Sequence, residues 1–132
     1  MNNLLIWGDI YPPKDNLYHL PNINMLFSPE LELYISSSII VVGNLECALT
    51  DIPMPVKKAG PVLYLPSNAA KIIKSMGFHA LGLANNHIRD CGTEGILSTI
   101  RACEKYGLEY FGVGENKEKA KTHFEKEVCG KR

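Results

Sequence analysis

Short apolar runs alternate along the chain with amphipathic segments, and the apolar runs end in glycine, asparagine or aspartate. This alternation is typical of a parallel α/β sheet in which helices connect successive strands. The runs are continuously apolar, which favours strands that are covered on both faces. The predicted strands are Leu4–Trp7, Ile39–Val42, Ala80–Ala84 and Tyr110–Val113.

Capping signals predict three helices between these strands. Ser28-Pro29-Glu30 supplies an N-cap, a proline in the first helical turn and an acidic side chain near the helix N-terminus. Ser67 is predicted to cap a second helix that runs through Met76. The third and clearest helix is predicted over Thr93–Tyr106, and Gly107 is expected to end it.

Two segments depart from this pattern. Residues 49–66 contain several prolines and no periodicity, which predicts a long loop or an irregular hairpin, and long ordered loops are often functional. Residues 124–132 alternate like a strand that enters a hairpin turn. The partner strand would follow that turn, so the sequence looks like part of a longer domain.

The composition excludes several classes of protein. The 132 residues carry 14 basic and 14 acidic side chains, and 45% of them are hydrophobic. These values are ordinary for a globular domain and argue against a disordered polyelectrolyte or a basic nucleic-acid-binding protein. The chain has no recognisable signal peptide and no apolar stretch of about 20 residues, so a cytoplasmic chain without a membrane segment is expected.

The four cysteines are not spaced like ligands of a zinc site. No C-x-x-C motif occurs, and the cysteines lie far apart. We expect all four to be reduced and to serve as small apolar residues. They are Cys47, Cys91, Cys103 and Cys129.

Polar residues follow three of the four predicted strands. Gly8-Asp9 follows the first, Gly43-Asn44-Leu45-Glu46 the second, and Asn85-Asn86-His87 the third, with Asp90 three residues later. Ligands of open parallel sheets collect outside the carboxyl ends of the strands, where these side chains would meet. Two carboxylates, an amide and an imidazole suit Mn, Fe, Zn or Mg. Such a metal could polarise a phosphoryl oxygen and lower the pKa of a bound water.

His87 has a second possible role. If the Asp90 carboxylate holds the imidazole, His87 could donate a proton to a leaving group instead of binding the metal. Each residue also has an ordinary explanation: Asp9 in a turn, Glu46 as a solvated loop acid and Asn85-Asn86 in a left-handed turn. It is their occurrence together at one end of successive strands that favours a site.

The other histidines and a glycine-rich stretch carry weaker signals. His19, His79 and His123 lie away from the predicted carboxylates and are given no role. Gly112–Lys117 resembles the start of a dinucleotide fingerprint, but Lys117 stands in place of the third glycine. A turn followed by a short helix that Asn116 caps explains this stretch equally well.

These same residues resemble the bacterial capsule synthesis protein CapA family, the poly-gamma-glutamate synthesis proteins of the calcineurin-like metallophosphoesterase superfamily. Gly8-Asp9 is similar to the first family motif, and Gly43–Glu46 is similar to its N-L-E motif. Residues 84–92 match the signature A-N-N-H-x-x-D-x-G. The resemblance extends from about Leu4 to the last residue.

The resemblance implies a role for each site residue. Asp9, Glu46 and Asn86 would bind a divalent metal, His87 would be the acid that meets the leaving group, and Asp90 would be its partner. The neighbouring amides of Asn44 and Asn85 are expected to contact substrate. Tyr11 stands where the superfamily usually has a histidine, and the later histidine motifs are absent, so one metal position is expected to be weak or missing.

The resemblance also implies a fold: α/β, the N-terminal half of an α/β/β/α sandwich, with a mainly parallel sheet flanked by helices. Residues 1–132 would then be a single, truncated domain with one sheet face uncovered. That face would make the isolated chain marginally stable or aggregation-prone, or would bind a second copy or a C-terminal half in trans. Members of this family are often membrane-associated.

Three hypotheses of function follow. The first is a metal-dependent phosphoesterase-like protein of capsule or poly-gamma-glutamate biosynthesis, acting on a phosphoester or an anionic polymer and enzymatic if its missing half completes it. The second is a non-catalytic remnant or one half of a split protein. The third is a nucleotide-binding α/β module, which rests only on the α/β alternation and the Gly112–Lys117 stretch.

Overall fold

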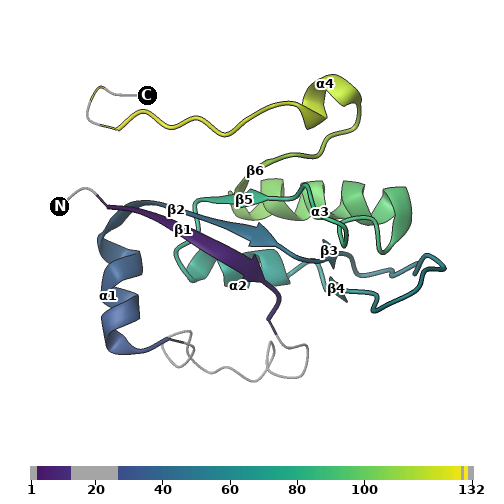
Figure 1. The fold of residues 1–132 in the computed structure, drawn as a ribbon, viewed down its shortest axis with the longest axis horizontal. Helices are drawn as coiled ribbons and strands as arrows, with labels where there is room; N and C mark the ends of the chain where they lie inside the picture. The colour runs from purple at the N-terminus through teal and green to yellow at the C-terminus, as the bar shows by residue number, and fades with distance from the viewer. Residues whose placement is uncertain (1–2, 13–26, 129, 131–132) are drawn as a thin grey trace.

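The computed structural model describes residues 3–12, 27–128 and 130, and these form a mainly parallel α/β structure. Its main sheet has four parallel strands in the order β1-β2-β5-β6 (Figure 1). The strands are β1 (Asn3–Ile10), β2 (Ser38–Leu45), β5 (Ala80–Gly82) and β6 (Glu109–Phe111). The predicted fold class is confirmed.

The first two strands are longer than the sequence predicts. Parallel pairing continues past the apolar runs, with Asp9 opposite Asn44 and Ile10 opposite Leu45. Asp9 and Asn44 therefore belong to the strands themselves and do not follow them, while Glu46 comes directly after β2. The register shifts between Ile6 and Asp9, and the pairing that resumes at Asp9 fixes the polar side chains more firmly than a loop would.

The three predicted helices are present as α1 (Pro29–Ser37), α2 (Ala69–Ser75) and α3 (Gly92–Tyr106). As predicted, Ser28 caps α1 by accepting a hydrogen bond of 3.3 Å from the Leu31 N–H. Gly107, with φ of 67°, ends α3 in the left-handed conformation that glycine adopts at low cost.

The prediction that Ser67 caps α2 is wrong. The N-cap position belongs to Asn68, whose side chain makes no capping bond. The hydroxyl of Ser67 instead donates a hydrogen bond of 2.6 Å to Asp51, and the Ser67 N–H donates a second one of 2.8 Å to the same carboxylate. The Ser67 hydroxyl is thus bound to a carboxylate 16 residues away and does not cap α2.

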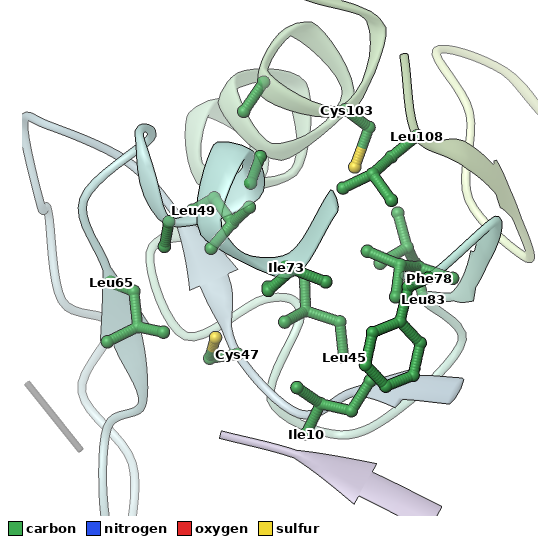
Figure 2. Packing of buried hydrophobic residues seen from close by; sticks show 14 of the residues in the cluster. Ile10, Leu45, Cys47, Leu49, Leu65, Ile73, Phe78, Leu83, Cys103 and Leu108 are labelled. Carbon is green, nitrogen blue, oxygen red and sulfur yellow. The ribbon is translucent and has the colours of Figure 1, made fainter. Parts of the chain in front are cut away.

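The core lies between one face of the main sheet and the helices. Because the strand order follows the chain and parallel crossovers are right-handed, successive helices fall on the same face of the sheet. Figure 2 shows this core, in which Leu45 of β2, Ile73 of α2 and Cys103 of α3 are fully buried. Within this cluster, burial of each large apolar side chain contributes on the order of 1.5–3 kcal/mol.

The opposite face of the sheet is largely open, so the prediction of strands covered on both faces is wrong for β1. Leu4 and Ile6 are 62% and 75% exposed. A hollow of about 680 Å³ lies over this face, and its lining includes Phe124 from the C-terminal segment. The uncovered, apolar face that the family resemblance implies is therefore present in the described part of the chain.

The irregular segment contains a second, two-stranded sheet. In it, β3 (Ala48–Leu49) pairs with β4 (Tyr64–Leu65) in parallel, so the alternative of an antiparallel hairpin is wrong. The Leu49 N–H donates a hydrogen bond of 2.8 Å to the buried hydroxyl of Thr99, which ties β3 to α3. Residues 51–63 between the two strands form an ordered loop without helix or strand.

The described residues of the C-terminal part include one short helix. As predicted, Asn116 caps it, accepting a hydrogen bond of 2.9 Å from the Lys119 N–H, and the helix is α4 (Lys117–Ala120). Residues 122–127 form neither helix nor strand, and Val128 makes a single β-bridge, so the predicted strand is not formed there. The rest of that prediction, at Cys129, Lys131 and Arg132, lies outside the described residues.

Two further predictions concern the cysteines and the membrane. Cys47, Cys91 and Cys103 are buried and are not joined to one another by disulfide bonds, while Cys129 lies outside the described residues. Burial raises the pKa of the Cys103 thiol to about 12, so it behaves as an apolar core residue. In the described ranges, none of the helices has the length and hydrophobicity needed to span a bilayer.

Candidate functional site

The carboxyl ends of β1 and β2 bring two carboxylates to one amide. The Asn44 amide nitrogen donates a hydrogen bond of 2.8 Å to Asp9 Oδ1 and one of 2.5 Å to Glu46 Oε2. Asp9 faces Asn44 across the paired strands, and Glu46 lies two residues after Asn44, on the same side of the extended backbone. Two acidic side chains therefore converge on one amide nitrogen, which donates a hydrogen bond to each.

Asn85 connects the end of β2 to the segment that follows β5. Its amide nitrogen donates to Asn44 Oδ1 at 3.1 Å and to the Leu45 carbonyl at 2.7 Å. Its Oδ1 accepts from the backbone N–H groups of His87 and Ile88, each at 3.0 Å. An amide has two donor hydrogens and two acceptor lone pairs, so all are in use. A substrate contact at Asn85, as predicted, would require one of these bonds to break.

The predicted pairing of His87 with Asp90 is seen directly. His87 Nδ1 lies 2.7 Å from Asp90 Oδ2. Because an ionised carboxylate only accepts hydrogen bonds, Nδ1 carries the hydrogen and donates it. The other ring nitrogen, Nε2, is then left to face a metal or a substrate. It lies 4.0 Å from Glu46 Oε1.

Asp90 is the most buried charged group of the site, with only 1% of its side chain exposed. Its carboxylate accepts hydrogen bonds from His87, from Lys58 Nζ at 2.5 Å and from the Leu63 N–H at 2.7 Å. Burial alone would raise the pKa of Asp90, but these hydrogen bonds and the charge of Lys58 outweigh it. The pKa of Asp90 therefore lies below its ordinary value, and the group is ionised at neutral pH.

Lys58 is a further residue of the site, and the sequence alone does not mark it. It lies in the irregular loop, 32 positions before Asp90, and its ammonium also lies 3.5 Å from His87 Nδ1. No local pattern marks Lys58, since Lys57 precedes it and the surrounding residues lack periodicity. The expectation that the long loop is functional was the only signal that pointed to this region.

Asn86, predicted as a metal ligand, stands apart from this network. Its side chain is exposed, and within the described ranges we find no hydrogen bond to it. An exposed amide whose oxygen accepts no hydrogen bond within the described ranges remains chemically suitable as a ligand. Its metal-binding role stays a prediction.

The donor set fits a hard divalent cation in part. Within the part of the chain that the structure describes, no group of three or more His, Cys, Asp or Glu side chains is close enough to hold a metal. Asp9 and Glu46 supply two carboxylates, and any further ligands would have to be amides, His87 Nε2 or water. Mg²⁺ and Mn²⁺ tolerate such oxygen-rich, partly hydrated sites.

The glycines of the Gly112–Lys117 stretch have a packing explanation. Gly112 has φ of 86°, and a Cβ there would lie 2.7 Å from the Ala84 side chain. A Cβ on Gly114 would lie 2.6 Å from the Ala120 nitrogen, so this glycine allows α4 to pack closely. The nucleotide-binding hypothesis therefore loses its only specific motif.

Comparison with known proteins points to one family. The sequence matches the profile of the family described as "Bacterial capsule synthesis protein PGA_cap" over residues 3–132. A Bacillus anthracis protein named "Capsule biosynthesis protein CapA" is 35% identical over 102 residues, which are 75% of this chain and 25% of that protein. A Bacillus subtilis (strain 168) protein named "PGA biosynthesis protein CapA" is 32% identical over 93 residues, 69% of this chain and 24% of that protein.

A third relative carries no functional name. An uncharacterized protein from Sinorhizobium fredii is 32% identical over 99 residues, which are 71% of this chain and 21% of that protein. The chain thus spans about a fifth to a quarter of the length of these curated relatives.

Proposed function

Since the chain belongs to the bacterial capsule synthesis protein family PGA_cap, we propose that it serves the synthesis of an anionic capsule polymer through metal-dependent phosphoester chemistry. The observation that carries this proposal is the convergence of Asp9 and Glu46 on one amide nitrogen, with His87 Nε2 4.0 Å from Glu46 Oε1. Carboxylates with an oriented imidazole are the groups that metal-assisted hydrolysis requires.

Asp9 and Glu46 would hold the cation, with the exposed Asn86 amide as a further oxygen ligand. A bound divalent metal supplies a Lewis acid for a phosphoryl oxygen and lowers the pKa of a bound water. The formal net charge of the chain is zero, so attraction for an anionic substrate would have to arise locally at this site.

His87 would exchange a proton with the substrate at Nε2. Its Nδ1–H is committed to Asp90, which fixes the ring orientation and leaves Nε2 as the reactive nitrogen. Asn85 would act indirectly, because it holds the backbone of His87 against the end of β2. In this proposal one carboxylate orients the imidazole and two others face the metal.

The test combines metal binding and hydrolysis on the full chain. Titration calorimetry with Mn²⁺ should show binding that Asp9→Asn and Glu46→Gln weaken at least tenfold. Hydrolysis of a phosphodiester such as bis-p-nitrophenyl phosphate should require Mn²⁺ and fall at least a hundredfold in His87→Ala. The exposed Glu118→Gln in α4 is the matched control and should behave as the wild type. Activity that survives in both Asp9→Asn and His87→Ala would refute the assignment.

A second candidate is a site that residues outside this chain complete. Two observations favour it: the described residues offer only two clustered carboxylates, and an apolar sheet face is left open. If the second candidate is correct, the chain alone should bind Mn²⁺ weakly or not at all, and a longer relative should bind it tightly. Tight binding by the chain alone would support the first candidate.

A further inference from the structure

Lys58 of the irregular loop lies close to both members of the His87–Asp90 pair. Its ammonium lies 2.5 Å from Asp90 Oδ1 and 3.5 Å from His87 Nδ1, and 24% of its side chain is exposed. An exposed ion pair would contribute little, but here one partner is almost fully buried. Loss of the lysine would leave a buried carboxylate oxygen without its donor.

The two oxygens of Asp90 have different partners. Oδ1 accepts from Lys58, whereas Oδ2 accepts from His87 and from the Leu63 N–H. A carboxylate held at Oδ1 cannot rotate about its Cβ–Cγ bond without breaking the lysine contact. Rotation would carry Oδ2 away from His87, so the lysine contact stabilises the histidine contact.

The irregular loop does not depend on Lys58 for its attachment. The Val56 N–H donates a hydrogen bond of 2.9 Å to the Asp90 carbonyl, and the Leu63 carbonyl accepts one of 3.2 Å from the Ala48 N–H. These two bonds lie on either side of Lys58 in the sequence and involve only backbone atoms. Removal of the lysine side chain should therefore leave the loop in place and affect chiefly the carboxylate and the imidazole.

We propose that Lys58 is a positioning residue for the reaction: it fixes the Asp90 carboxylate and thereby holds the His87 imidazole in the Nδ1–H tautomer with Nε2 turned toward Glu46. This inference rests on the proposed function for its kinetic consequence. Its structural consequence, the state of the ring, is independent of any activity. Lys58 acts through Asp90 and does not need to touch the substrate.

The experiment measures the ring and the rate separately, with four forms of the full chain: wild type, Lys58→Met, Lys58→Arg and the control Lys57→Met. Methionine keeps the length of the side chain and removes its charge and donors, whereas arginine keeps both. Lys57 is the neighbouring, exposed lysine. Imidazole ¹⁵N shifts of His87 at about pH 8, where an ordinary histidine is neutral, report which nitrogen carries the hydrogen.

The wild type, Lys58→Arg and Lys57→Met should show His87 protonated at Nδ1, and Lys58→Met should show a mixture of tautomers. In the Mn²⁺-dependent phosphodiester assay, kcat of Lys58→Met should fall about 10–100-fold with KM within about twofold, and arginine should restore most of kcat. If the tautomer changes in Lys58→Met but none of the four forms hydrolyses the phosphodiester, the positioning role is supported and the proposed function is refuted.

Other outcomes overturn the inference. If His87 keeps the wild-type tautomer in Lys58→Met, the lysine does not position the ring, whatever the kcat of that variant. A rise in KM with unchanged kcat shows that Lys58 binds substrate instead. Failure of Lys58→Met to fold, while Lys58→Arg folds, shows that the lysine holds the structure and not the ring in particular.

Discussion

The side-chain amide of Asn85 donates a hydrogen bond of 2.7 Å to the backbone carbonyl of Leu45, across 40 residues of sequence. Through this bond the segment after β5 is attached to the end of β2. The neighbouring asparagine, Asn86, is exposed and lies outside the network. The two adjacent asparagines therefore have different surroundings, and their substitution is expected to affect stability differently.

Asn85→Ala should destabilise the chain, whereas Asn86→Ala should not. Loss of the four hydrogen bonds of Asn85 should lower the free energy of unfolding by about 2–4 kcal/mol. Asn86→Ala should stay within about 0.5 kcal/mol of the wild type, yet weaken Mn²⁺ binding if Asn86 is a ligand. Urea unfolding and calorimetry measure the two effects. Equal stability losses in both variants would contradict the structure.

Thr99→Val should cost more stability than Thr99→Ser. The buried hydroxyl accepts from the Leu49 N–H at 2.8 Å and donates to the Gly95 carbonyl at 2.7 Å. Valine removes the acceptor and leaves a buried N–H without its partner, which costs about 1–3 kcal/mol. Serine keeps the hydroxyl and loses only a methyl group, about 1 kcal/mol. A larger loss in the serine variant would show that packing outweighs the hydrogen bond.

His79 should make the chain less stable as the pH falls below neutrality. Burial, together with the charges of Lys74 and Lys126, lowers the pKa of His79, whose Nδ1 accepts a hydrogen bond of 3.0 Å from the Val41 N–H. The unfolded state takes up the proton first, so this stability is present above about pH 6.5 and is lost as the pH falls toward the folded-state pKa.

His79→Asn tests that assignment, because the asparagine Oδ1 can accept the same hydrogen bond without titrating. The slope of unfolding free energy against pH between about pH 7 and pH 5 should be shallower in this variant. His123→Asn, at an exposed position, is the control and should keep the wild-type slope. An unchanged slope in His79→Asn would assign the dependence to another group.

Ile6→Lys should reduce self-association without lowering stability. Ile6 is 75% exposed on the open sheet face. The ammonium of a lysine at this position would stay in water and would interrupt an apolar surface. The unfolding free energy should change by no more than about 0.5 kcal/mol. Ile52→Lys is the control, because Ile52 is 78% exposed on the irregular loop. Light scattering across a concentration series should separate the two, and equal behaviour would argue against association through the sheet face.

Most of the main sheet follows from local sequence, because apolar runs and capping residues act over a few positions. The extension of β1 to Ile10 does not follow from local sequence. Strand propensity would end β1 before its polar residues, but pairing with β2 continues the strand through them. The two-residue strands β3 and β4 are too short to show any period. Ser67 was misassigned because Asp51, brought near by the fold, competes for its hydroxyl.

The candidate site divides in the same way. The residues Asp9, Glu46, His87 and Asp90 follow from their places at the ends of predicted strands, and the structure brings them together. Lys58 cannot be predicted from its place in the sequence, because its contact with Asp90 depends on the path of an irregular loop. The full use of the Asn85 amide is likewise a tertiary property, visible only once its partners are in place.

The strands lie in the sheet in the same order in which the ribosome makes them. Each new strand adds at one growing edge, and none has to enter between two strands already joined. The sheet can therefore assemble progressively during synthesis, with each new strand pairing with the strand of the same sheet that was made before it. The polar cluster is completed late in this sequence, when Asn85 and Asp90 reach groups on β2 and on the irregular loop that were made before them.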